Sequence, residues 1–405
     1  MSDHDWQAPG GAPAGGSVPD ATGTPYGAAP TPPQAPGAAA SAGPYAGMVP
    51  PPMPPGAWTP PPKPGLLPLR PLGFGTLLWA PFRVLRRNPA ATFGSGLVVQ
   101  LVSVLATLAV FVPFALFVFS RVENVSSADA DAILSGAVGG FLLLMLVPVA
   151  ISLVASAFLQ GVMVVEVASG TLGERLGFGA LWRRAAKRIW PLLGWTAIFT
   201  GAILLVIAAF VALIVVAAVT STTALVVAIV VALFAGLGFA ALGVWIGTKV
   251  SLVPSVIVLE RAGIGAAVRR SWQLTNGYFW RTFGTLLLVA VILNIAAQVV
   301  VQPVSLIGTI VAAIVDPTAS GAYLTITIVT TVVTVILSLL IGAITAVVQA
   351  ALVAVIYIDL RMRKEGLDLE LVRHVELRDA GQPVGDPYGV PESPGAVGAA
   401  GPSGS

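Results

Sequence analysis

Six long apolar runs determine what this chain can fold into. They lie near residues 94–120, 134–166, 190–219, 224–259, 284–315 and 323–359. A helix needs about 20 residues to cross about 30 Å of hydrocarbon, and every run is longer than that. The runs are continuously apolar rather than alternating, which favours helices over a β-barrel. The sequence therefore predicts an all-α, polytopic membrane protein with six transmembrane helices.

Composition supports this class, since 56% of the residues are hydrophobic and only 10% are charged, whereas soluble domains carry about 25% charged residues. A soluble globular enzyme is thereby excluded. The chain has no cysteine, which excludes disulfides, thiolate catalysis and cysteine-ligated metals. The second, fourth and sixth runs return the chain to the side where it started, and we call them the returning runs. A helix rises about 1.5 Å per residue, so these runs are longer than one crossing requires. We expect them to tilt, to break near Pro148 and Pro254, or to project into the cytoplasm.

The distribution of basic residues predicts an orientation. Nineteen of the 21 Lys and Arg residues precede the first run, lie in the connections 167–189 and 260–283, or follow the last run. Arg121 falls on the other side, and Lys249 lies inside an apolar run. By the positive-inside rule both termini are cytoplasmic, in the cytoplasmic (inner) membrane. This membrane interpretation also explains the basic charge without nucleic acid as a partner.

The two ends of the chain differ from the middle. Residues 1–64 hold 18 of the 33 prolines, and such a Pro-, Gly- and Ala-rich segment cannot bury enough apolar surface to fold. We expect a disordered cytoplasmic tail at 1–64, a membrane domain at 65–371 and a second disordered tail at 372–405. A ligand role for the proline motifs is the alternative for the first tail.

An imperfect repeat divides the membrane domain into three hairpins, each preceded by a similar short segment. The segments begin with the tetrads Leu72-Gly73-Phe74-Gly75, Leu176-Gly177-Phe178-Gly179 and Ala262-Gly263-Ile264-Gly265. An arginine pair follows each tetrad: Arg86 and Arg87, Arg183 and Arg184, Arg269 and Arg270. We interpret the segments as cytoplasmic amphipathic helices whose arginines contact lipid headgroups. The alternative is an ordinary positive-inside anchor without lipid specificity.

Each returning run closes with an acid, at Glu166, Glu260 and Asp359. Lys249 could pair with Glu166 or Glu260 within the membrane and mark a polar cavity. The alternative is that Lys249 lies near the interface and extends its ammonium group to water. Both histidines, His4 and His374, lie in the tails. Together with the absence of known catalytic motifs, this predicts no catalytic residue, no metal and no cofactor.

Three stretches resemble a known family: 72–89, Arg269 to Trp280, and Tyr357 to Asp368. They are similar to the membrane domain of bacterial glycerophosphoryl diester phosphodiesterases and to related stand-alone actinobacterial membrane proteins. The resemblance covers about residues 70–371. It implies that catalysis in those phosphodiesterases belongs to a separate soluble barrel, for which this chain has no room after residue 371. No catalytic residue is therefore carried over.

We expect a non-enzymatic integral membrane protein that organises lipids or partner proteins at the inner leaflet. Two alternatives remain open. One is a small-solute transporter or permease subunit, suggested by Lys249 and the repeated, broken helices. The other is a membrane regulator of a separately encoded phosphodiesterase, which the family resemblance alone suggests. The expected partners are membrane lipids and proteins of the same membrane.

Overall fold

The structure is a computed structural model that describes residues 65–122, 137, 140–141, 143–318 and 321–389. These residues belong to one compact unit. Every regular element among them is a helix, and six helices are long and apolar enough to cross a membrane. The predicted fold class is confirmed: this is an all-α, multi-pass membrane protein. The tail predicted at 1–64 and the last residues, 390–405, lie outside the described residues.

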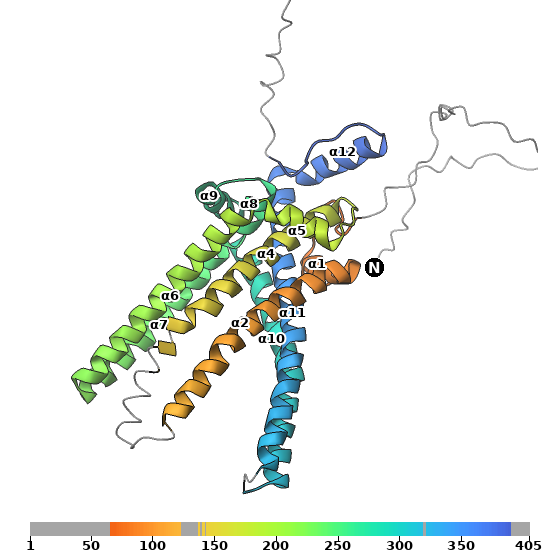
Figure 1. The fold of residues 1–405 in the computed structure, drawn as a ribbon. Helices are drawn as coiled ribbons and strands as arrows, with labels where there is room; N and C mark the ends of the chain where they lie inside the picture. Colours follow the sequence, from red (N-terminus) through yellow and green to blue (C-terminus); the bar gives the residue numbers. More distant parts are fainter. Residues whose placement is uncertain (1–64, 123–136, 138–139, 142, 319–320, 390–405) are drawn as a thin grey trace, which may run out of the picture. The chain divides into compact units, whose positions relative to one another are not determined.

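The helices form three hairpins, and a short helix precedes each of them (Figure 1). We call these short helices the leading helices; they are α1 Phe74–Arg87, α5 Phe178–Ala186 and α9 Ile264–Thr275. The hairpins pair α2 Pro89–Val122 with α4 Leu146–Thr171, α6 Ile189–Thr220 with α7 Thr222–Val250, and α10 Phe279–Val315 with α11 Ala322–Glu365. Two further helices are α8 Val253–Leu259 and α12 Leu367–Asp379. The predicted arrangement of three hairpins is confirmed.

The leading helices are amphipathic because of the spacing of their apolar residues. In α1, Leu77, Ala80 and Val84 are three or four positions apart and buried, whereas Arg83 and Arg86 are exposed. This spacing produces one apolar face on a helix. Each leading helix starts directly after an extended glycine of its tetrad: Gly73, Gly177 or Gly263.

The fourth predicted span is broken, as its proline suggested. Helix α7 ends at Val250 and α8 begins at Val253, so that Pro254 stands in the first turn of α8. Proline is tolerated there because it lacks only an N–H that has no partner in a first turn. Pro148 similarly falls in the first turn of α4, and a turn at Met145 separates α4 from the helical residues 143–144 before it. The sixth span continues beyond its predicted end to Glu365 and stops at Gly366, whose φ of 67° suits glycine.

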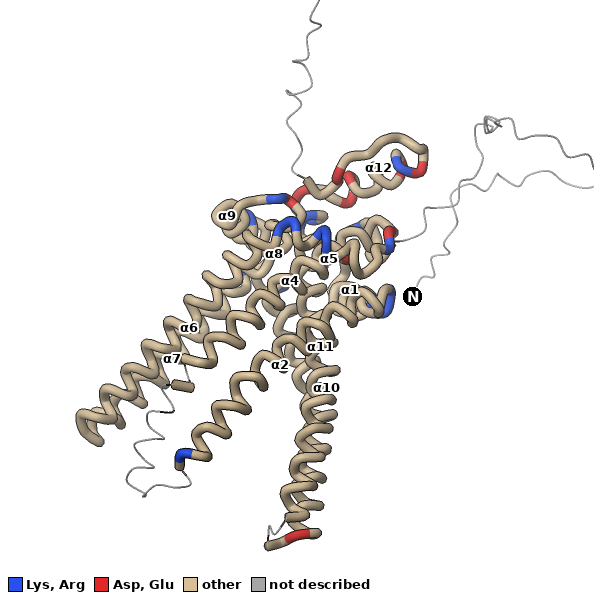
Figure 2. Tube along the Cα trace, viewed as in Figure 1, with Lys and Arg blue, Asp and Glu red and all other residues tan. Residues whose placement is uncertain are grey.

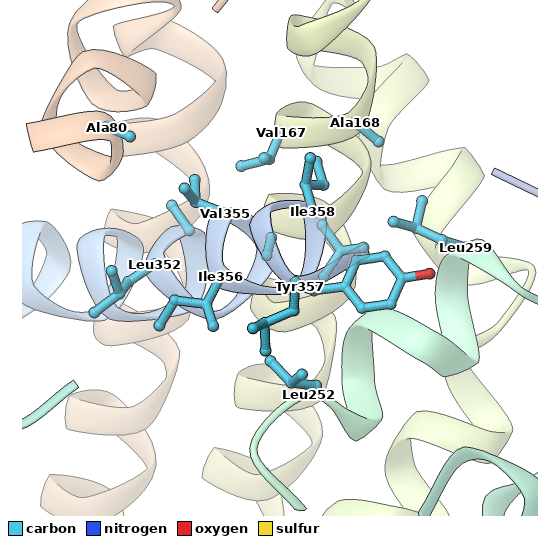
Figure 3. Close-up of a cluster of buried hydrophobic side chains, with 14 of the residues drawn as sticks. Ala80, Val167, Ala168, Leu252, Leu259, Leu352, Val355, Ile356, Tyr357 and Ile358 are labelled. Atoms are coloured by element: carbon cyan, nitrogen blue, oxygen red, sulfur yellow. The ribbon is translucent and has the colours of Figure 1, made fainter. Parts of the chain in front are cut away.

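The hydrophobic core lies at the end of the hairpins that carries the leading helices. Helix α11 is central to it, packing against α1, α2, α4 and α10. Figure 3 shows Ile356 and Tyr357 on this helix, within the cluster of buried side chains that also contains Leu252. At the other end large apolar side chains are exposed, among them Phe119, Leu205, Phe234 and Ile314. Exposed apolar surface of this extent requires a cover, which lipid supplies.

The prediction of a disordered tail from residue 372 is wrong for residues 372–389. Helix α12 runs to Asp379 and buries Leu367, Leu371 and Val375. The chain then turns back, and Tyr388 is only 3% exposed, with its hydroxyl donating to the Ala168 carbonyl at 3.0 Å. The physical reason is the four-residue spacing of the apolar residues of α12, which gives an otherwise charged helix one apolar stripe.

Candidate functional site

Basic side chains gather at one end of the hairpins (Figure 2). We call this end, which carries α1, α5, α9 and α12, the basic end. The opposite end of α2 carries Arg121. Three tryptophans that flank the leading helices or lie on them are among the most exposed side chains: Trp79 is 67% exposed, Trp190 79% and Trp280 78%. Exposed indoles beside arginines are typical of a membrane–water interface.

The structure separates the members of two of the three arginine pairs. Arg86 and Arg269 are exposed, as headgroup contact requires. Arg87 instead turns inward and donates to the Glu174 carbonyl at 2.8 Å, and burial lowers its pKa against the opposing effect of Glu166. Arg270 is also bound within the protein. In the second pair, Arg183 and Arg184 are both exposed.

Arg87 and Arg270, which we predicted to contact headgroups, bind groups of the protein instead. In α9 the reason is geometric, because Arg270 lies on the side of the helix that packs against α8 and α11. Its Nε is 3.0 Å from Glu260 and its Nη2 is 2.6 Å from Glu365. Burial lowers the pKa of Arg270, but these two carboxylates outweigh burial and raise it.

A polar cluster at the basic end is built around Glu260. Besides Arg270, this carboxylate accepts a 2.7 Å hydrogen bond from the Tyr357 hydroxyl. The same hydroxyl accepts from Arg361 Nη1 at 3.1 Å, and Arg361 also pairs with Glu365 at 3.0 Å. The cluster thereby joins the end of α8, helix α9 and the end of α11. Its members satisfy one another, which is what a buried polar network requires.

The structure does not bring together the predicted pair of Lys249 and Glu260, since Glu260 binds Arg270 and Tyr357 and Lys249 lies elsewhere. Lys249 is 6% exposed and lies at the end of α7. Its Nζ stands 5.5 Å from the centre of the Trp272 ring, a cation–π geometry. Its backbone carbonyl accepts from the Ser271 hydroxyl at 2.7 Å. Lys249 thus helps to bind α7 to α9.

A second cluster is built around Asp359, which is 1% exposed. The carboxylate accepts from the backbone N–H of Leu72 at 2.8 Å, from Arg281 at 3.3 Å and from Arg363 at 3.1 Å. Both arginines also donate to the Leu72 carbonyl. The third acid, Glu166, accepts long hydrogen bonds of 3.4 and 3.5 Å from Asn88. All three acids that close the returning helices therefore bind the segments that begin the hairpins.

Sequence reasoning missed Tyr357, Arg361 and Tyr388. A single tyrosine in an apolar run indicates packing and nothing more. The only signal for Arg361 is its place in the stretch that carries the family resemblance. Tyr388 lies in a segment whose composition is typical of disorder, and only the tertiary contact with Ala168 distinguishes it.

A cavity of about 680 Å³ opens at the basic end between α4, α5, α8 and α12. We call it the cationic cavity, because five of its lining residues are basic: Arg184, Lys187, Arg188, Arg261 and Arg378. The segment 384–388 forms one wall of it. A second cavity, of about 360 Å³, lies among α4, α6, α8 and α11 and contains Gln160 and Gln349 beside apolar residues.

The described ranges hold no group of three or more metal-ligating side chains. No family model matches the chain, and no curated protein or solved structure matches it either. The chemistry of the basic end must therefore be inferred from its own residues. Their positive charge and hydrogen-bond donors suit anions, and the indoles of Trp79, Trp190 and Trp280 are exposed beside them.

Proposed function

We propose that this chain is a non-enzymatic protein of the cytoplasmic membrane that organises anionic lipids at the inner leaflet, with both termini cytoplasmic. One observation carries the proposal: exposed arginines and exposed tryptophans occur together on or beside the leading helices. Arg86, Arg183 and Arg269 are exposed, and Trp79, Trp190 and Trp280 lie within 11 positions of them in sequence. Indoles prefer the headgroup layer, and arginines near a membrane surface attract anionic lipid.

The exposed apolar surface beyond the basic end supports this proposal. In the most apolar 18-residue stretch of α2 none of the residues is buried. In the corresponding stretches of α6 and of the span 222–259 only 6% of the residues are buried. Lipid therefore covers the larger part of these helices. The cationic exposed faces of the three leading helices would enrich anionic lipid around the protein. This lipid would in turn recruit partner proteins that bind anionic lipid.

The test measures lipid contact directly. Full-length protein is reconstituted in phosphatidylcholine with a minor fraction of brominated phosphatidylglycerol, and quenching of tryptophan fluorescence by the brominated lipid is recorded. We expect quenching above that given by brominated phosphatidylcholine at the same fraction. The triple variant Arg86→Gln, Arg183→Gln, Arg269→Gln should remove this excess. The triple change to lysine should retain it, as should Arg121→Gln at the opposite end.

The second cavity favours one rival function, transport of a small solute. It is lined by Gln160, Gln349 and Trp195, with three hydroxyl-bearing residues among apolar ones. A flux assay in proteoliposomes tests this function. Solute uptake that Gln160→Ala abolishes and the triple glutamine variant does not alter would favour transport over lipid organisation.

A further inference from the structure

The cationic cavity holds more positive charge than the protein neutralises. Its five basic residues are accompanied by two carboxylates, those of Glu174 and Asp386. Asp386 pairs with Arg261 at 3.6 Å. Arg378 donates to the Leu172 carbonyl at 2.9 Å. Arg378 also contacts Asp379 at 3.4 Å. Like charges on one cavity wall repel one another, and an anion between them removes that repulsion.

Three of the five basic side chains of the cavity have no acceptor among the described residues. Within the part of the chain that the structure describes, the side chains of Arg184, Lys187 and Arg188 form no hydrogen bond or ion pair with the protein. They are close in sequence, at the end of α5 and in the turn before α6. Arg188 is half-buried, while the other two are exposed. The end of α5 and the turn after it therefore present three cationic donors to the cavity, and no acceptor for them lies in these described ranges.

The other walls of the cavity have different chemistry. Ala168, Leu172, Val258 and Leu259 give an apolar surface from α4 and α8. Tyr388 lies against it, anchored by its hydrogen bond to Ala168. The volume of about 680 Å³ lies within the roughly 300–1,000 Å³ of typical ligand pockets. The space is therefore large enough for a charged group together with the part of a molecule that carries it.

A phosphoryl group fits this set of donors best. Arginine and lysine form short, charge-assisted hydrogen bonds to phosphate oxygens, and several cations around one group suit its charge of about −1.5 to −2 better than the single charge of a carboxylate. His374, on the same wall as Arg378, can donate one further hydrogen bond.

We propose that the cationic cavity binds one phosphoryl group, held by Arg184, Lys187 and Arg188. The group belongs either to an anionic lipid headgroup or to a small soluble phosphate. This inference rests on the proposed function where the source is a lipid, because it adds one stoichiometric site to the lipid that surrounds the bundle. For a soluble phosphate it stands independently.

The experiment uses the full chain in phosphatidylcholine nanodiscs and has two arms. In the soluble arm, binding of inorganic phosphate is measured by equilibrium dialysis with the radiolabelled anion. In the lipid arm, nanodiscs contain a minor fraction of phosphatidic acid, and native mass spectrometry counts the lipid molecules retained per chain. We expect one phosphate or one phosphatidic acid per chain. The variant Arg184→Gln, Lys187→Gln, Arg188→Gln should weaken binding at least tenfold.

The matched control is Arg83→Gln, Arg86→Gln, Arg269→Gln, which removes three exposed charges outside the cavity. It should leave stoichiometric binding unchanged. Arg184→Lys with Arg188→Lys, which keeps the charge, should stay within a few-fold of wild type and guards against a folding defect. The inference is overturned if the cavity variant binds like wild type or if wild type binds neither probe. If wild type shows no preference for the brominated anionic lipid but binds one phosphate or one phosphatidic acid per chain, only the proposed function is overturned.

Discussion

The backbone N–H of Leu72 donates a 2.8 Å hydrogen bond to the carboxylate of Asp359, which lies 287 positions later in the chain. Asp359 is 1% exposed, and Arg281 and Arg363 complete its shell. This contact joins the segment that begins the first hairpin to the last helix of the third. The basic end is therefore held together by specific polar contacts as well as by apolar packing.

Replacement of Asp359 should weaken the fold. In Asp359→Asn, the amide oxygen can still accept from Leu72, but Arg281 and Arg363 lose their counterion. Removing one partner of a buried ion pair costs roughly 3–5 kcal/mol. Both arginines are partly exposed, at 27% and 22%, so we expect a loss of about 2 kcal/mol after solvent screening. Unfolding by sodium dodecyl sulfate, followed by tryptophan fluorescence, measures it.

The control for this prediction is Asp379→Asn, because Asp379 is 56% exposed and pairs only with its neighbour Arg378. An exposed ion pair of this kind contributes at most about 1 kcal/mol. Equal losses in the two variants would contradict the structural role of Asp359.

The hydroxyl of Tyr357 should be coupled energetically to Glu260. Tyr357→Phe removes one hydrogen bond from Glu260 and one from Arg361 in a mostly buried place, at a cost of about 1–3 kcal/mol. In a double-mutant cycle with Glu260→Gln, the two losses should differ from additivity by at least about 0.5 kcal/mol. Chemical unfolding in detergent of wild type, the two single variants and the double variant provides the four free energies that the cycle needs.

A suitable control for the cycle is Tyr278→Phe. The Tyr278 ring lies 5.7 Å from Lys364 Nζ, a contact that phenylalanine preserves, and no hydrogen bond of its hydroxyl occurs among the described residues. Unfolding free energies should change little in this variant. Strict additivity for Tyr357 and Glu260 would refute the cluster.

Helix α2 packs closely against α11 at Gly96. A Cβ atom added there would lie 2.6 Å from Val347 and 2.7 Å from the Ala343 carbonyl oxygen. The backbone oxygen cannot move aside without shifting α11, so Gly96→Ala should cost about 1–3 kcal/mol despite the better helix propensity of alanine. Thermal unfolding monitored by tryptophan fluorescence would show a lower midpoint.

Gly94, two residues earlier, is the matched control. A Cβ there meets nothing closer than the Phe178 ring at 3.9 Å, which is ordinary contact. Gly94→Ala should therefore be neutral or slightly stabilising, because alanine favours the helix. A midpoint reduced equally in both variants would mean that α2 and α11 are not in close contact at Gly96.

The sequence predicted the coarse fold because each apolar run is a local signal. The tetrads marked where each repeat begins, and the acids Glu166, Glu260 and Asp359 marked where each returning run ends. The sequence did not indicate which residues these acids bind. The inward direction of Arg87 and Arg270 could not be predicted, since neighbouring arginines have equal sequence signals and only helix packing decides which one faces the core. The same holds for Tyr388, whose burial depends on a contact with a helix 220 positions away.

Anchoring of the last described segment should depend on Tyr388. Tyr388→Ala removes a fully packed ring, a change that costs about 3–5 kcal/mol in well-packed cores. Because residues 383–389 form no regular helix, we expect the loss to appear as local opening of this segment, with the membrane helices intact. Hydrogen exchange followed by mass spectrometry should show faster exchange in 380–389 and unchanged exchange in α11. Tyr388→Phe, which keeps the ring, should exchange at an intermediate rate.

Stability should rise with pH through the titration of His374. Burial first, and then Arg378, lower the pKa of His374, while Glu174 and Asp386 oppose them. The unfolded chain, with a histidine pKa of about 6.5, therefore binds more protons than the folded chain between that value and the lower folded pKa. The contribution is complete above about pH 6.5 and is lost as the pH falls through this window. We expect the thermal midpoint to fall as the pH is lowered from 7.5 to about 5.5. His374→Gln should flatten this slope, and His4→Gln should preserve it. A slope that persists in His374→Gln would assign the pH dependence to other groups.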